Sequence, residues 1–166
     1  MQIKHYVLYL LTVLIAWGGL GTSWGYSADT PLWTHFTFHF AHGNVFHLAA
    51  NMFVLYTLIF LRNDKWWMWL VSYIIATLCS FIVTTHFITI GFSGIIFVVY
   101  GIIFLKDGIK WKPLAQVSLF MLLSCLFANK MAIGLHFVCL FSGTLIGGFI
   151  GAIKEMKRKE KLYGRK

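Results

Sequence analysis

The chain has 166 residues, of which 59% are hydrophobic and 11% charged, and its mean hydropathy is +0.77. A typical soluble domain carries about a quarter charged residues, and a small domain has too little interior to hide so much apolar surface. The composition therefore excludes a water-soluble globule and a disordered chain, and the +9 formal charge, placed at the ends of apolar runs, indicates membrane orientation rather than nucleic-acid binding.

Polar breaks divide the chain into six apolar runs, which we predict to be membrane-spanning helices because backbone groups in lipid must pair within the segment. In chain order, the predicted spans are residues 6–26, 46–61, 66–85, 93–105, 113–128 and 133–153. The first run is longer than the apolar region of a signal peptide, and Tyr26 and Ala28 do not form a small-x-small cleavage site, so we expect it to be retained.

The basic residues orient these spans. With a cytoplasmic N-terminus, all of the 14 Lys and Arg except Lys130 lie on the cytoplasmic side. This asymmetry predicts an even number of spans with both termini cytoplasmic. We predict a six-span membrane domain over residues 1–153 and a basic cytoplasmic tail over residues 154–166.

Two loops carry unusual composition. Residues 27–45 are rich in aromatics and histidine, which predicts a loop lying in the membrane interface. Residues 85–92 are apolar, and we expect them to dip into the bundle, where protein covers the backbone. His5, His35, His39 and His86 are predicted to lie at interfaces and are assigned no chemistry.

Several chemistries are excluded by what the spans lack. All five acidic residues lie in loops or in the tail, which argues against a carboxylate proton relay, an intramembrane aspartyl protease and a Ser-His-Asp triad at depth. There is no H-E-x-x-H zinc motif, and the cysteines show no metal-site or disulfide-framework spacing. We therefore expect no metal and no cofactor.

Four polar residues remain in the outer half of the predicted spans: His47, Asn51, Ser93 and His136. Their spans run in the same direction, so the helical rise places them at similar depth. His47 and Asn51 share one helix face and could donate to an oxyanion, or could form a polar patch that joins helices. Ser93 needs a base to become a nucleophile, and His136 is the candidate, although a glycine-flanked serine is also common in helix packing.

Taken in order, these segments resemble the rhomboid family of intramembrane serine proteases. The matching residues are His42-Gly43-Asn44-Val45-Phe46-His47-Leu48-Ala49-Ala50-Asn51-Met52, then Gly91-Phe92-Ser93-Gly94, then His136 with Gly143. The resemblance covers nearly the whole chain and implies an all-α, six-transmembrane-helix bundle whose partners are transmembrane protein substrates. It implies a dyad of Ser93 as nucleophile and His136 as general base, with His47, Asn51 and the Ser93 N–H as the oxyanion hole.

The resemblance also implies supporting roles. Phe97 matches an aromatic position that stacks on the catalytic histidine, and His42 and Asn44 match a structured first loop. Trp33 and Phe36 match the aromatic anchors of that loop. Further supporting positions are Gly91, Gly94 and Gly143; the Gly143, Gly147 and Gly151 stripe favours close contact with the fourth span.

The chain departs from many relatives at Thr34 after Trp33, at Leu61-Arg62-Asn63-Asp64 after the second span, and at Cys139 where a glycine is frequent. None of these departures touches the dyad. Two alternatives stay open: a non-catalytic rhomboid-like protein that binds membrane clients, and a haem-binding membrane subunit with His47 and His136 as axial ligands. The expected location is the bacterial plasma membrane with the site toward the extracytoplasmic side.

Overall fold

A computed structural model describes residues 3–61, 66–83, 86–106, 115, 119 and 132–163. The described residues form six α-helices, a short 3-10 helix and a π-helical turn. In chain order these are α1 (Ile3–Gly18), α2 (Thr34–Thr37), η1 (Phe38–Phe40), α3 (Val45–Tyr56), η2 (Thr57–Leu61), α4 (Trp66–Ile82), α5 (Ser93–Lys106) and α7 (Ala132–Tyr163). Their backbone contains two isolated bridges, Leu20 with His42 and Tyr26 with Thr89.

The predicted spans and the helices agree best in the middle of the chain. The second, third and fourth predicted spans begin within one residue of α3, α4 and α5. The first is shorter than predicted, because α1 ends at Gly18 and an irregular segment follows. The sixth is longer: α7 continues as one helix to Tyr163. The fifth predicted span, 113–128, lies almost wholly outside the described residues.

By length and composition, one described helix is long and apolar enough to cross a membrane, over Ile133–Tyr163. Four shorter apolar helices accompany it, at Tyr6–Gly18, Val45–Ile59, Trp66–Ile82 and Ser93–Leu105. At 1.5 Å per residue, the 14 residues of α5 reach about 21 Å, short of a hydrocarbon core of about 30 Å.

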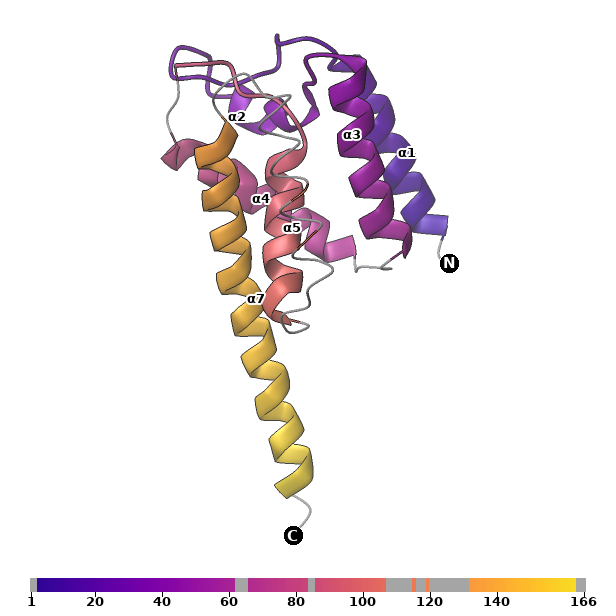
Figure 1. Ribbon diagram of the computed structural model, residues 1–166, viewed down its shortest axis with the longest axis vertical. Coiled ribbons are helices and arrows are strands. Elements are labelled where there is room, and N and C mark those ends of the chain that lie inside the picture. Colours follow the sequence, from indigo (N-terminus) through magenta and orange to yellow (C-terminus); the bar gives the residue numbers. More distant parts are fainter. Residues whose placement is uncertain are drawn as a thin grey trace.

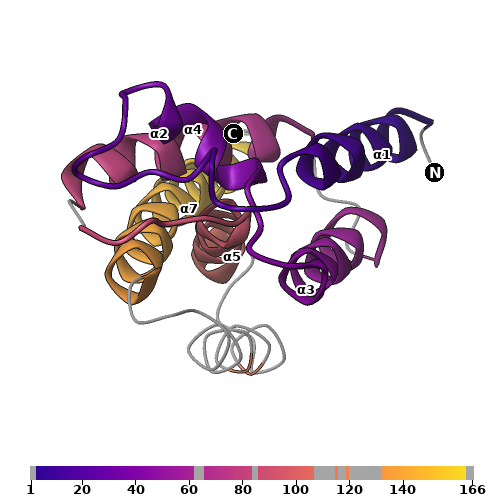
Figure 2. The same ribbon diagram turned by 90° about the horizontal axis from the view of Figure 1, so that it is seen from above.

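The helices α3, α5 and α7 run in the same direction, and their N-terminal ends lie beside the first loop (Figure 1). The helix α1 begins, and α7 ends, at the other end of the bundle. From above, α5 and α7 lie side by side with α4, while α1 and α3 form a separate pair (Figure 2). This arrangement brings the polar residues of three helices to one end of the molecule.

The interface between α5 and α7 is built on glycine. A Cβ added to Gly143 would collide with the carbonyl oxygen of Val98, and one added to Gly147 would collide with that of Ile102. Across the interface, a Cβ on Gly101 would strike the carbonyl oxygen of Leu140. The two backbones therefore touch directly, as in small-xxx-small contacts between membrane helices.

The first loop is fastened to α4 by histidine side chains. The Nε2 atom of His39 lies 3.0 Å from Thr77 Oγ1, and Nδ1 of His35 lies 2.8 Å from Ser80 Oγ. The Tyr73 hydroxyl donates to the Phe36 carbonyl at 2.9 Å. His39 is fully buried: its Nε2 pairs with Thr77, while its Nδ1 has no partner among the described residues.

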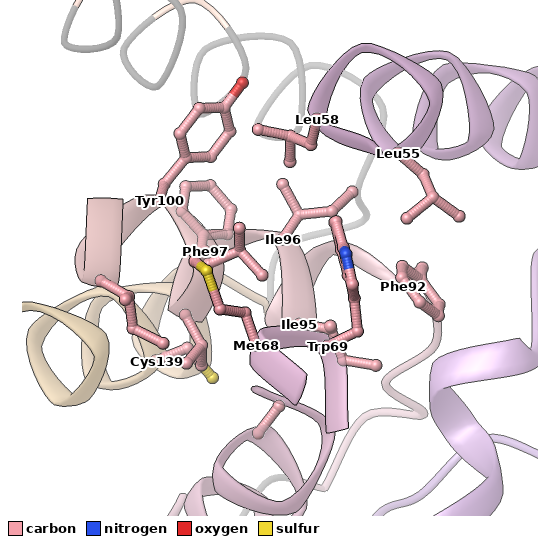
Figure 3. Close-up of a cluster of buried hydrophobic side chains, with 14 of the residues drawn as sticks. Leu55, Leu58, Met68, Trp69, Phe92, Ile95, Ile96, Phe97, Tyr100 and Cys139 are labelled. Atoms are coloured by element: carbon pink, nitrogen blue, oxygen red, sulfur yellow. The ribbon is translucent and has the colours of Figure 1, made fainter. Parts of the chain in front are cut away.

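The apolar core lies where α4, α5 and α7 meet. Figure 3 shows Met68, Ile95, Phe97 and Cys139 in one cluster of buried side chains. Along α5, every described side chain from Phe92 to Ile103 is buried. A helix that is apolar all round and covered all round is the central helix of its bundle.

Candidate active site

The central feature of the site is a serine and a histidine in direct contact. Ser93 Oγ lies 2.7 Å from His136 Nε2. Both residues are buried, with 6% and 4% of their surface exposed. If His136 carries its ring proton on Nδ1, its Nε2 accepts the serine proton, which is the geometry of a nucleophile with its base.

The turn before Ser93 presents it to His136. Gly91 has φ +117°, a conformation that L side chains rarely adopt, and its N–H donates to the Phe38 carbonyl at 2.9 Å. Thr89, two residues earlier, pairs with Tyr26 through two backbone hydrogen bonds of 2.8 and 3.1 Å. The first loop therefore holds the segment that the sequence predicted to dip into the bundle.

The start of α5 supplies backbone donors. Because α5 begins at Ser93, the N–H groups of its first turn have no carbonyl partner within the helix. The helix dipole adds a partial positive charge at the same place. Negative charge that develops near Ser93 is favoured there, as the oxyanion of acyl transfer requires.

The His136 ring has an aromatic neighbour on α5. The Phe97 ring lies with its centroid 4.5 Å from that of His136, at an interplanar angle of 34°. Cys139, one turn after His136, is fully buried, and a Cβ built on Gly94 would be 3.6 Å from its sulfur. Cysteine at this departure from the family pattern therefore fits the helix contact without a clash.

His47 lies close to the serine turn. A Cβ on Gly91 would lie 2.8 Å from His47 Nε2 and 3.7 Å from Ser93 Oγ, so imidazole and hydroxyl border one small space. Any side chain at Gly91 would fill that space. This gives Gly91 a second reason to be glycine, besides its φ angle.

Asn51 is buried one turn further along α3, with 2% of its surface exposed. Its Nδ2 donates to the His47 carbonyl at 3.0 Å, and its Oδ1 is buried without a partner among the described residues. The amide carries two hydrogens, so one donor remains after this bond. The structure thus brings His47 to the serine turn, and it holds the Asn51 amide on its own helix.

Asn44 and His42, the two supporting residues predicted in the first loop, form hydrogen bonds with nearby backbone groups. The Asn44 side chain caps α3 by accepting from the His47 N–H at 2.9 Å. His42 is fully buried, its Nδ1 is 3.1 Å from the Phe40 carbonyl, and its ring lies 5.0 Å from that of His47. Burial first, and the neighbouring His47 second, lower the pKa of His42 to about 4, so the ring is neutral near pH 7.

Sequence reasoning missed the contacts that fasten the first loop. The Phe38 carbonyl, the His39–Thr77 pair and the His35–Ser80 pair are not visible as motifs. A signal existed in Thr77 and Ser80, which lie three apart and so share one face of a helix whose other hydroxyl side chains are Ser72 and Tyr73. In the haem alternative, His136 would be an axial ligand. In the structure its Nε2 atom is instead hydrogen-bonded to Ser93 Oγ.

Comparison with curated proteins and with solved structures gives no match. The model of the Rhomboid domain family matches residues 29–154, most of the chain. The match contains the first loop, the serine turn and the beginning of α7. The chain therefore belongs to the rhomboid family, whose members are generally intramembrane serine proteases that act on transmembrane substrates.

Proposed function

We propose that this chain is a serine endopeptidase that hydrolyses peptide bonds in or near transmembrane segments of other membrane proteins. The observation that carries the proposal is the 2.7 Å contact between Ser93 Oγ and His136 Nε2 inside the bundle. A buried serine that only packs in a helix can donate its hydroxyl hydrogen to a nearby backbone carbonyl. Here the hydroxyl pairs with an imidazole, which can act as a base, and this supports a chemical role.

In this mechanism His136 takes the Ser93 proton as Oγ attacks the scissile carbonyl carbon. The tetrahedral oxyanion is stabilised by the Ser93 N–H, the free Asn51 hydrogen and His47. His136 then donates its proton to the leaving amine, which breaks the peptide bond and leaves an acyl-enzyme. Water, deprotonated by His136, releases the acyl group and regenerates Ser93.

The substrate must be unwound locally, because a peptide bond within a helix is shielded by its own hydrogen bonds. We infer that substrates carry small or helix-breaking residues near the cut. We further infer six spans with both termini cytoplasmic, in a bacterial plasma membrane. The charge asymmetry supports this topology. So does the bundle, in which the serine turn lies at one end, while the start of α1 and the end of α7 lie at the other.

The experiment is labelling of detergent-purified protein with a fluorophosphonate serine probe. Labelling is expected in the wild type and lost, by at least about a hundredfold, in Ser93→Ala and in His136→Ala. Matched controls are Ser142→Ala, a serine of α7 that bonds to Cys79, and His86→Ala, an exposed histidine, and both are expected to label as the wild type does.

Equal labelling of the wild type and Ser93→Ala would overturn the proposal. No labelling of folded wild type, beside a rhomboid protease that labels, would favour a client-binding protein without catalysis. An absorbance band near the haem Soret position that disappears in His136→Ala would favour the haem alternative.

A further inference from the structure

A cavity of about 280 Å³ lies between the α1–α3 pair and the α4–α5 pair. Its walls come from α1 (Leu8, Thr12), α3 and η2 (Leu55, Ile59), the first loop (Phe40), α4 (Trp66, Trp69, Leu70, Tyr73) and the start of α5 (Phe92, Ile95). Figure 3 shows the Trp69 indole standing between Ile96 on one side and Leu55 and Phe92 on the other. The proposed proteolysis makes no use of this space.

The cavity walls are apolar, which excludes a water cluster as the natural occupant. Their polar atoms are mostly satisfied within the protein: Thr12 donates to the Leu8 carbonyl at 2.8 Å and Tyr73 to the Phe36 carbonyl at 2.9 Å. The Trp69 indole N–H has no partner among the described residues, but it is buried out of reach of the cavity and places no demand on the occupant. A fitting occupant is thus an apolar one.

The size of the cavity decides the shape of the occupant. An engineered cavity of about 150 Å³ holds a benzene molecule, so this cavity has roughly twice that room. Along α4, the wall from Trp66 to Tyr73 extends roughly 10 Å, which suits a narrow, elongated chain.

The mouth of the cavity faces the membrane. Trp66 and Leu70 are 61% and 52% exposed, although both line the cavity. In a membrane protein, the medium at such a surface is lipid, whose acyl chains are narrow and apolar.

From these observations we infer that the cavity binds one acyl chain of a membrane phospholipid, with its ester end at the exposed mouth beside Trp66 and Leu70. Phe92 closes the far wall directly before Ser93, so the bound chain lies behind the serine turn. The binding itself does not depend on the proposed protease activity.

The test is a titration of purified protein, in a short-chain polyoxyethylene detergent, with dioleoyl phosphatidylglycerol, followed by intact-protein mass spectrometry. Two variants fill the cavity from opposite walls: Thr12→Phe on α1 and Leu70→Trp on α4. Their controls are Leu11→Phe and Leu78→Trp, which introduce the same aromatic side chains at exposed positions outside the cavity. Monodisperse elution and cooperative thermal unfolding show that each variant is folded.

We expect one saturable lipid per chain in the wild type and both controls, with binding weakened at least fivefold in the two filled variants. Binding of a single-chain lysophospholipid at the same site would support recognition of one chain. The inference is overturned if the wild type takes up no saturable lipid, or if folded filled variants bind as the controls do. It is also overturned if filling abolishes a dimer rather than a lipid adduct, since the occupant is then a second copy. Serine labelling of the same samples reports on the protease proposal separately.

Discussion

The two sides of α5 are packed in different ways. Toward α7, backbone lies on backbone, and Gly101, Gly143 and Gly147 leave no room for a methyl group. Toward the α1–α3 pair, contacts are few, and the cavity bordered by Leu55 and Phe92 separates the helices. The Ser93–His136 pair belongs to the tight side, while His47 and Asn51 belong to the loose side.

This difference separates two requirements of the proposed chemistry. A nucleophile and its base must stay within hydrogen-bond distance, and a direct helix contact fixes that distance. Oxyanion donors must leave room for a substrate to enter, which a loosely packed helix permits. The first loop bridges the two sides, since His39 fastens it to α4 and Asn44 leads it into α3.

The largest effect is expected from adding a methyl group to the tight interface between α5 and α7. Gly143→Ala places a Cβ against the Val98 backbone, which cannot move as a side chain can, so we expect a loss of up to about 3 kcal/mol in the free energy of unfolding. Serine labelling should fall with it. The measurement is the thermal unfolding midpoint in detergent together with the rate of fluorophosphonate labelling.

The matched control is Gly134→Ala on the same helix. Its Cβ would meet Val83 at 3.9 Å, an ordinary contact, so its stability should equal or exceed that of the wild type. Equal midpoints for the two variants would show that α5 and α7 are not in backbone contact.

The next effect concerns the loop that joins the two sides. Thr77→Val leaves His39 Nε2 buried without a partner, and we expect a loss of about 2 kcal/mol. Adding His39→Phe removes the unpaired ring nitrogen. The double variant should therefore lose less unfolding free energy than the two single variants lose in sum. A double-variant cycle of unfolding free energies measures this. Additive losses would mean that the two side chains do not interact.

A smaller effect is expected at the start of α3. Asn44→Ala removes the cap on the His47 N–H and should cost about 1 kcal/mol, with labelling slowed as the first turn of α3 frays. Asn44→Asp keeps an accepting oxygen and should retain both properties. The same two measurements apply, and wild-type labelling in Asn44→Ala would place His47 outside the reaction.

Sequence patterns predicted much of this molecule because its main signals are local. Apolar runs set the positions of α3, α4 and α5, and polar residues at corresponding depths in the spans brought Ser93 and His136 together as candidates. The glycine spacing of the sixth predicted span indicated its contact with the fourth, which the structure realises at Gly143 and Gly147.

Other features depend on contacts between distant segments and leave no local pattern. After α1 ends at Gly18, the chain pairs with the backbone of His42 in the first loop. The His42 N–H donates to the Gly19 carbonyl at 3.1 Å, so the helix does not continue. The burial of His39 depends on Thr77, 38 residues later. The cavity behind Phe92 lies between the α1–α3 pair and the α4–α5 pair. Its existence depends on how these two pairs pack together, so no pattern within one segment predicts it.

The smallest expected effect is a pH dependence of the bridging loop. Burial lowers the pKa of His39 to about 3, below the ordinary value of about 6.5. Between these two values the unfolded chain binds a proton that the folded chain does not, so this contribution to stability is complete above pH 6.5 and declines as the pH falls toward 3. From pH 7 to pH 6 the loss amounts to about 0.7 kcal/mol for each such histidine. His42, whose pKa is also lowered, should add a similar loss.

The measurement is the unfolding midpoint at pH 7 and at pH 6 for the wild type, His39→Gln and His86→Gln. A glutamine side chain cannot take up the proton, so His39→Gln should lose less stability over this interval than the wild type. His86 is exposed, so His86→Gln is the control for the same substitution outside the core. Identical pH dependence in all three proteins would mean that His39 is solvated, and the loop would then be bound to α4 by its other contacts alone.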